Sequence, residues 1–146
     1  MRIAIGSDHR GFALKEGLKE LLGELGHEWV DFGCQSEEPV DYPDVAQPLA
    51  EAVARGEFDG GILICGSGIG MSIAANKVKG VRAALCCKAC SAELTRRHND
   101  ANILCLAAMN DLNENLSCVD VFLKTNFECG RHLRRVEKIT AMEKAT

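Results

Sequence analysis

Short apolar runs alternate with stretches of helical periodicity along most of the chain. Five runs of five or six residues are largely hydrophobic and end in turn residues, which predicts strands over 2–7, 28–32, 60–64, 81–86 and 103–107. Between and after these runs, apolar residues recur at helical spacing, which predicts helices over 12–25, 45–55, 68–77, 89–97, 112–123 and 133–143. Residues 36–43 are mostly polar, contain two prolines and predict a loop.

This alternation of elements predicts the fold class. The predicted strands are nearly continuous apolar runs, as expected when helices cover both faces of a sheet. We therefore predict an α/β fold: a doubly wound, Rossmann-like sheet of five parallel strands, with right-handed crossovers and helices on both faces. A length of 146 residues suits one domain and no linker or repeat divides it, so residues 1–146 are expected to form a single domain.

Charge and hydropathy argue against two kinds of partner. The formal net charge of −4 disfavours non-specific binding to nucleic acid. No apolar run approaches the roughly 18 residues that a membrane span needs. The apolar stretch at the N-terminus is too short for a signal peptide. We therefore expect a cytoplasmic protein that binds neither nucleic acid nor membrane.

The eight cysteines do not indicate a disulfide scaffold. Cys65, Cys86 and Cys105 lie in apolar runs, where a free cysteine behaves as a small hydrophobic residue. Cys87 and Cys90 have the CxxC spacing, but the second pair that a zinc site would need is absent. A redox pair is the other alternative, which the flanking residues do not favour. We interpret these cysteines as incidental thiols of a reducing compartment and predict neither a metal nor a cofactor.

Residues that can do chemistry follow the predicted strands. In doubly wound sheets, ligands bind beyond the carboxyl ends of the strands. Asp8 and His9 follow the first predicted strand, and Cys65 follows the third. His98 and Asn99 differ, because they follow a helix and precede the last strand. Capping of a helix is the simpler explanation for Asp8, and contacts at a helix end are the simpler explanation for His98 and Asn99.

The segment after the third predicted strand reads Cys65-Gly-Ser-Gly-Ile-Gly70. Its glycines let a ligand approach the main chain, and the N–H groups that begin the next helix form a site for negative charge. The spacing matches neither a P-loop nor the dinucleotide fingerprint, and a tight turn without a ligand is the alternative. A thiol at a helix N-terminus can become a base or nucleophile, whereas a buried cysteine ending a strand is the simpler explanation for Cys65.

Two arginines near the end of the chain complete the candidates. Arg131 and Arg135 are four residues apart, so on a helical turn they point in the same direction and can clamp one phosphate. A solvated basic surface is the more common explanation for such a pair. Arg134 and Lys138 are expected to be its solvated neighbours.

Taken together, these segments resemble the B-type ribose-5-phosphate isomerases, a family that also holds subunits of galactose-6-phosphate isomerase. The similarity covers nearly the whole chain, and its separate motifs occur in the order typical of the family. The matching segments are Gly6-Ser-Asp-His9, Gly11-Phe-Ala-Leu-Lys15, Val40-Asp-Tyr-Pro43, the residues from Asp59 to Lys77, His98-Asn-Asp-Ala-Asn-Ile-Leu104, Gly130-Arg-His132 and Arg135-Val136.

The resemblance implies an aldose–ketose isomerase of the pentose phosphate pathway that interconverts ribose 5-phosphate and ribulose 5-phosphate without a metal. It implies that Cys65 is the base that moves a proton between C2 and C1, and that His98 helps to open the furanose ring. Ser67 and Asp8 would handle protons on the sugar oxygens. The substrate contacts that it implies are Tyr42 and Asn99 on the sugar, His9, Arg131 and Arg135 on the phosphate, and the backbone N–H groups of Gly66, Gly68, Ile69 and Gly70 on the enediolate.

The resemblance also implies an assembly. The family forms homodimers, often paired into dimers of dimers, and its active sites are shared between subunits. Residues such as His98 and the two arginines are therefore expected to serve the Cys65 of a partner copy.

The sequence departs from the family pattern at two places. Ser67 stands where the family usually has threonine, which keeps the hydroxyl. More seriously, the family usually shows Gly-x-Arg, whose arginine contacts phosphate, where this chain has Leu106–Leu112 without an arginine. Either a phosphate contact is lost, or Arg134 or Lys88 replaces it, and we hypothesise that Arg10, beside His9, partly compensates. Two alternatives stay open: an isomerase of a six-carbon aldose phosphate, such as allose 6-phosphate or galactose 6-phosphate, and a non-catalytic module that binds phosphosugars.

Overall fold

A computed structural model describes residues 1–145. Within that range the chain forms one five-stranded sheet in which every strand pair is parallel, and the strand order is β2-β1-β3-β5-β4. This confirms the predicted doubly wound α/β fold. The strands are β1 (Arg2–Ser7), β2 (Glu28–Asp31), β3 (Gly60–Cys65), β4 (Ala83–Leu85) and β5 (Ile103–Ala107).

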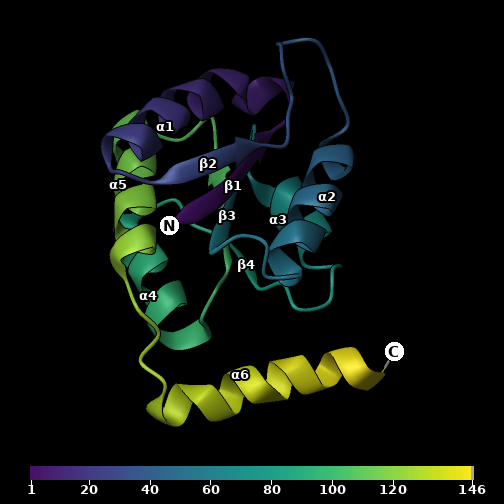
Figure 1. Cartoon of the computed structure of the whole chain (residues 1–146), viewed down its shortest axis with the longest axis vertical. Helices are drawn as coiled ribbons and strands as arrows, with labels where there is room; N and C mark the ends of the chain where they lie inside the picture. The colour runs from purple at the N-terminus through teal and green to yellow at the C-terminus, as the bar shows by residue number, and fades with distance from the viewer. Residues whose placement is uncertain (146) are drawn as a thin grey trace.

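Helices cover both faces of the sheet (Figure 1). One face packs against α1 (Phe12–Glu24), α4 (Ala89–Asn99) and α5 (Leu112–Lys124), and the other packs against α2 (Tyr42–Ala54) and α3 (Ile69–Ala75). None of the helices in residues 1–145 has the length and hydrophobicity needed to cross a membrane.

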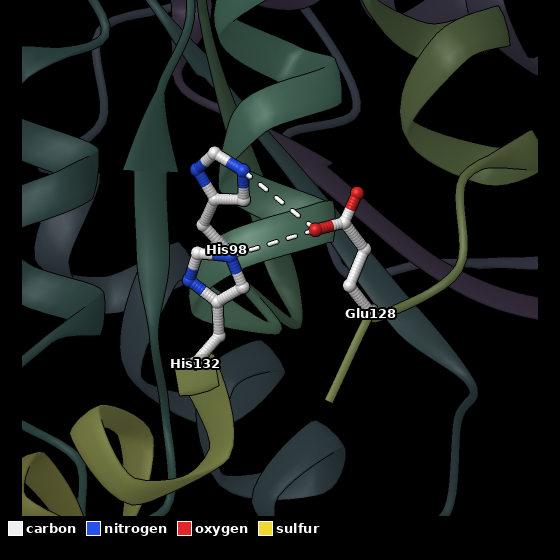
Figure 2. A group of neighbouring side chains, drawn as sticks. All are labelled: His98, Glu128 and His132. Atoms are coloured by element: carbon white, nitrogen blue, oxygen red, sulfur yellow. Dashed lines mark ion pairs between the residues drawn. The ribbon is translucent and has the colours of Figure 1, made fainter. Parts of the chain in front are cut away.

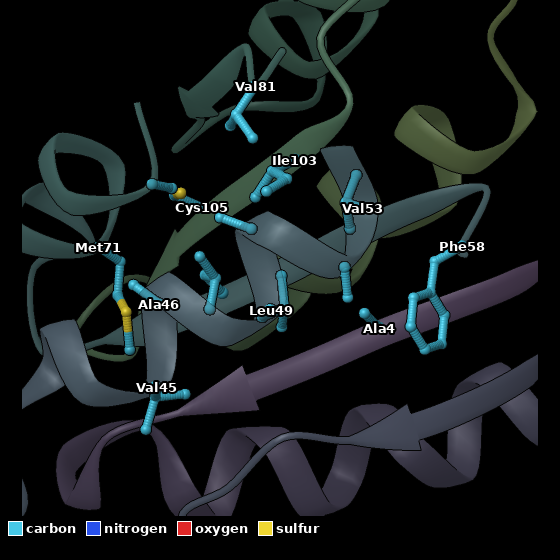
Figure 3. Packing of buried hydrophobic residues seen from close by; sticks show 14 of the residues in the cluster. Ala4, Val45, Ala46, Leu49, Val53, Phe58, Met71, Val81, Ile103 and Cys105 are labelled. Atoms are coloured by element: carbon cyan, nitrogen blue, oxygen red, sulfur yellow. The ribbon is translucent and has the colours of Figure 1, made fainter. Parts of the chain in front are cut away.

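The core has two halves, because successive residues of a strand point to opposite faces of the sheet. Ile62 and Ile64 of β3 pack towards α1 and α5, whereas Leu63 and Cys65 pack towards α2 and α3. Figure 3 shows the second half, in which Leu49 and Met71 reach the sheet from their helices. Each large apolar side chain buried in this way contributes about 1.5–3 kcal/mol, so both faces hold the central strands firmly in place.

The order in which strands are added across the sheet changes direction at β1, although all strand pairs are parallel. β2 lies on one side of β1, while β3 pairs with the other side in the register Ser7↔Ile64. Such a reversal leaves a crevice beyond the carboxyl ends of the two strands, where doubly wound proteins bind their ligands. Asp8 and Gly66 are the first residues after β1 and β3, so both enter this crevice.

Several element boundaries differ from prediction. Helix α2 begins at Tyr42 rather than at 45, because Asp41 is its extended N-cap and Pro43 is favourable in the first turn. Pro48 lies inside the helix, six residues after its start. Strand β4 covers only Ala83–Leu85, where it pairs with β5.

The last helix lies apart from the layered body of the molecule (Figure 1). Helix α6 (Gly130–Met142) begins three residues earlier than predicted, directly after Cys129, whose backbone has a positive φ of 57°. A short 3-10 turn, Glu143–Ala145, follows it. Helix α6 packs against α4, and its first turn, which carries His132, lies at the end of α4.

Candidate active site

The first chemical group of the crevice is the turn after β1. Asp8 is buried, and its Oδ1 accepts hydrogen bonds from the amides of Arg10 and Gly11, at 3.0 and 3.1 Å. Asp8 therefore does cap the 3-10 turn His9–Gly11. Both of these hydrogen bonds end on Oδ1, so the cap leaves Oδ2 available for another donor.

His9 has a defined proton position. Its Nδ1 accepts a hydrogen bond from the Val40 amide at 3.2 Å. When the ring is neutral, Nδ1 must therefore lack a proton, and Nε2 carries it. The loop that ends at Val40 thus holds the imidazole with an N–H donor at its other end.

Cys65 ends β3 and is buried, with 5% of its surface exposed. Its Sγ accepts a hydrogen bond from the Gly68 amide at 3.1 Å. Gly68 has a φ of 74°, and a Cβ there would lie 2.5 Å from Leu85 Cδ1 and 2.9 Å from the Leu106 backbone. Only glycine allows this turn to pass so close to β4 and β5, which brings its amide onto the thiol.

The amides of the glycine loop are not all equivalent. The Gly68 amide is directed at Cys65, and the Ile69 amide donates to Ser67 Oγ at 3.2 Å. The amides of Gly66, Ser67 and Gly70 make no hydrogen bond within residues 1–145. These unpaired donors surround the start of α3, where negative charge is stabilised.

Two side chains lie directly against this loop. The Tyr42 ring lies over Gly70, and a Cβ on that glycine would come within 2.6 Å of Cζ. Arg10 lies over Gly66, with its Cδ 3.0 Å and its Nη1 3.8 Å from where a Cβ would stand. The structure thus brings Asp8, His9, Arg10, Tyr42 and residues 65–70 together beyond the carboxyl ends of β1 and β3.

His98 and Asn99 do not join this group within one chain. They form the end of α4, and the Asn99 carbonyl accepts a hydrogen bond from Arg82 Nε at 3.0 Å. Arg82 immediately precedes β4, so His98 and Asn99 lie at the amino end of the strands. Cys65 lies at the carboxyl end, and the candidate residues therefore form two half-sites at opposite edges of the sheet.

The second half-site also contains the two arginines. Arg131 and Arg135 are both exposed on α6, one turn apart, and that helix packs against α4. Neither guanidinium makes a hydrogen bond or ion pair within the described part of the chain. Two unpaired guanidinium groups one turn apart can bind the oxygens of one phosphate.

Sequence reasoning missed two residues of this half-site, Glu128 and His132. The His98 and His132 rings are stacked, with centroids 4.1 Å apart and planes inclined by 12°. Glu128 Oε2 lies 3.9 Å from Nε2 of His98 and 3.5 Å from Nε2 of His132 (Figure 2). The spacing of Glu128 and His132, four residues apart, was the available signal, although it does not reveal their contact with His98.

This cluster is the group of described side chains that could hold a metal ion, since its ligand atoms lie within 4.8 Å of one another. The ring geometry argues against that use. A histidine lone pair lies in the plane of its ring, and the lone pairs of two stacked, nearly parallel rings do not converge on one ion. In addition, the Glu128 carboxylate is already bonded to Arg97, whose Nε donates a hydrogen bond to Oε1 at 2.5 Å. We therefore assign no metal to it.

The segment that departs from the family pattern lies beside the glycine loop. The Met109 amide donates to the Gly66 carbonyl at 3.1 Å, and the Met109 side chain is 72% exposed. Lys88, one candidate replacement for the missing arginine, is paired with Glu114 at 2.7 Å. Arg10 makes no side-chain hydrogen bond or ion pair within residues 1–145, so its charge is available above Gly66.

Comparison with known proteins identifies the family. The sequence profile of the Ribose/Galactose Isomerase family matches residues 3–139. Ribose-5-phosphate isomerase B of Escherichia coli K12 is 50% identical over 143 residues, which cover 97% of this chain and 96% of that protein. The structure of Clostridium thermocellum ribose-5-phosphate isomerase B matches with a TM-score of 0.97, 51% identity and 99% coverage of both chains. That of the Mycoplasma genitalium enzyme with bound ribulose 5-phosphate matches with a TM-score of 0.95 and 47% identity, over 99% of this chain and 97% of that one. The chain therefore belongs to the ribose/galactose isomerase family, as one of its ribose-5-phosphate isomerases of type B.

Proposed function

We propose that the protein interconverts ribose 5-phosphate and ribulose 5-phosphate through an enediolate, with Cys65 as the base and without a metal. The observation that carries this proposal is the position of the thiol. Cys65 Sγ lies at the β1/β3 crevice and at the start of a loop with unpaired amides. A base beside such donors removes a proton where negative charge develops. A related protein of 47% identity has been solved with bound ribulose 5-phosphate, which supports this substrate.

The enediolate is stabilised by the glycine loop in this proposal. Removal of the proton on C2 of the aldose places negative charge on the sugar oxygens. We assign the amides of Gly66, Ser67 and Gly70 to that charge, because those of Gly68 and Ile69 already have acceptors in the loop. One such donor can stabilise the transition state by about 3 kcal/mol. Asp8 Oδ2 and Ser67 Oγ then exchange protons with the sugar hydroxyls.

Hydrogen-bond donors, most of them on arginines, hold the phosphate in this proposal. His9 presents an Nε2 donor, and Arg131 and Arg135 form the clamp on α6. We add Arg10 to this set, because its unpaired guanidinium lies over Gly66, whose carbonyl accepts from the Met109 amide. Arg10 would thereby supply part of the positive charge that the missing arginine provides in the family.

A complete site requires two copies of the chain. Cys65 and His98 lie at opposite edges of one sheet, and proton transfer requires the groups that serve one substrate to converge. We therefore propose a homodimer, or a dimer of dimers, in which α4 and α6 of one copy face the crevice of the other. Apolar side chains are exposed beside both half-sites, namely Ile69 and Ile73 on α3 and Leu133, Ile139 and Met142 on α6. Tyr42 and Asn99 would contact the sugar from the two copies. The eight free cysteines agree with the cytoplasmic location that we propose.

The test compares turnover of ribose 5-phosphate and allose 6-phosphate by the unchanged protein and by Cys65→Ser. We expect ribose 5-phosphate to be the better substrate, and Cys65→Ser to lose about 10²–10⁴-fold in kcat. The serine oxygen can still accept from the Gly68 amide, so the melting temperature should change little. Preference for the six-carbon sugar would support the alternative substrate, which the absence of an arginine from Leu106–Leu112 would allow. Binding without turnover, or full activity of Cys65→Ser, would contradict the proposed mechanism.

A further inference from the structure

The His98 ring is held from two sides. Its flat face stacks on His132, which is 6% exposed, and its Nε2 faces the Glu128 carboxylate (Figure 2). The same oxygen, Oε2 of Glu128, also faces Nε2 of His132. One carboxylate and one buried ring therefore define the orientation of an imidazole at the exposed end of a helix.

Glu128 is itself fixed to α4. Its backbone amide donates to the Arg97 carbonyl at 3.1 Å, and its Oε1 accepts from Arg97 Nε at 2.5 Å. The hydrogen bond from Arg97 holds the pKa of Glu128 below its ordinary value, so the carboxylate is charged at neutral pH. A residue of the α5–α6 connection thus behaves as a fixed negative group at the end of α4.

This arrangement selects one tautomer of His98. A carboxylate opposite Nε2 favours a proton on that nitrogen, which leaves the lone pair of a neutral ring on Nδ1. Nδ1 lies on the side of the ring away from Glu128 (Figure 2). Burial is the main cause that lowers the pKa of His132. The positive charges of His98, Arg131 and Arg135 lower this pKa further, whereas the negative charge of Glu128 raises it. His132 is therefore neutral at neutral pH and does not repel a protonated His98.

We propose that Glu128 and His132 are positioning residues that hold His98 in the tautomer required for opening the furanose ring. The proposal rests on the proposed isomerase function. His98 Nδ1 takes the proton of the O1 hydroxyl, and the C1–O4 bond breaks as the C1=O1 carbonyl forms. The electron pair of the broken bond remains on O4, to which Nδ1 returns the proton. Glu128 stabilises the imidazolium that exists between the two transfers, as the buried aspartate does in catalytic triads.

The test separates ring opening from proton transfer at carbon. Ribulose 5-phosphate cannot close a furanose ring because its O5 carries the phosphate, so exchange of its C1 hydrogen with deuterium oxide requires only the enediolate step. We expect Glu128→Gln to lower kcat for ribose 5-phosphate by about 100-fold. Exchange at C1 of ribulose 5-phosphate, followed by proton NMR, should stay within about threefold of the unchanged protein, because that step belongs to Cys65.

Two further variants sharpen the result. Glu93→Gln is the matched control, because Glu93 is the other carboxylate on Arg97, at 3.1 Å, and faces neither ring. It should leave both reactions unchanged. His132→Phe keeps a flat ring beneath His98 but removes the second nitrogen, and it should lower isomerisation less than Glu128→Gln does.

Three outcomes would overturn the inference. They are unchanged isomerisation by Glu128→Gln, an equal loss of isomerisation and exchange, and an equal loss of isomerisation in Glu93→Gln. A protein that performs neither reaction before any substitution would instead overturn the proposed function. Because Glu128 is an exposed residue, its variant should keep the melting temperature of the parent protein.

Discussion

The Tyr42 ring rests on the backbone of Gly70, so the first turn of α2 and the first turn of α3 are in direct contact. A Cβ on Gly70 would lie 2.6 Å from Tyr42 Cζ, well inside van der Waals contact. Any side chain at position 70 would therefore clash with the Tyr42 ring in its present position. This contact places the phenol at the edge of the glycine loop, where the sugar is proposed to bind.

The first prediction concerns Gly70→Ala. The added methyl group should displace the Tyr42 ring and raise KM for ribose 5-phosphate by about tenfold, the loss expected for one ordinary hydrogen bond. Stability should not fall, because Gly70 has helical backbone angles and Tyr42 is 40% exposed, so the ring can move. Steady-state kinetics and thermal unfolding measure the two effects. Gly17→Ala is the matched control, since nothing lies within 4 Å of its Cβ. An unchanged KM in Gly70→Ala would argue against a substrate contact at Tyr42.

The second prediction concerns the charge of Arg10. Hydrogen bonds to charged groups are worth about 1.5–3 kcal/mol, so Arg10→Ala should weaken sugar-phosphate binding by about 10-fold to 150-fold. Arg10→Lys should recover part of the loss, because a lysine keeps the charge but not the bidentate geometry. Inhibition constants for inorganic phosphate measure this directly. Arg134→Ala is the comparison, since Arg134 is the other candidate for the missing contact. An effect of Arg134→Ala alone would assign the compensation to α6.

The hydrophobic pattern predicts most of this fold, because buried strands and amphipathic helices carry their own periodicity. The start of α2 differs from prediction because the helical pattern of apolar residues begins only at Val45, three residues after the helix itself, which starts behind Asp41 with Pro43 in its first turn. The relation of Glu128 to His98 escapes prediction for another reason, since it arises only when the α5–α6 connection folds back onto Arg97 of α4. Family resemblance proposes roles for individual residues, and the fold shows that one chain divides them between two edges of the sheet.

The third prediction concerns a buried charge pair outside the candidate site. Lys15 is fully buried and contacts Asp31, and its Nζ also lies 2.8 Å from Glu16 Oε1. Asp31→Asn would leave the Lys15 ammonium without its buried partner and should lower the free energy of unfolding by about 3–5 kcal/mol at pH 7. Urea denaturation measures the change. Glu57→Gln, in the exposed pair Arg55–Glu57, is the control and should change stability much less. An Asp31→Asn protein as stable as its parent would contradict a structural role for this pair.

The same pair predicts a dependence of stability on pH. Burial alone would raise the pKa of Asp31, but hydrogen bonds from Lys15, the Gly33 amide and Lys19 outweigh it and hold the pKa below its ordinary value. A carboxyl group with a lowered pKa in the folded state stabilises the fold above its unfolded pKa. That contribution is lost as the pH falls through the folded value. The unfolding free energy of the parent protein should therefore decline below about pH 4 more steeply than that of Asp31→Asn.

The last prediction concerns the sharing of sites between copies. Cys65→Ser and His98→Gln should each be nearly inactive alone, because every site would lack one of the two groups. After joint unfolding and refolding of equal amounts, roughly half of the dimers should contain one chain of each kind. Such a mixed dimer joins the intact Cys65 of one chain to the intact His98 of the other at one of its two sites. The mixture should therefore regain about one quarter of the parent activity. Cys65→Ser mixed with Ser67→Ala, whose substitutions lie in the same half-site, should regain none. An inactive first mixture would contradict the sharing of sites. It would mean that Cys65 and His98 of the same chain serve the same substrate.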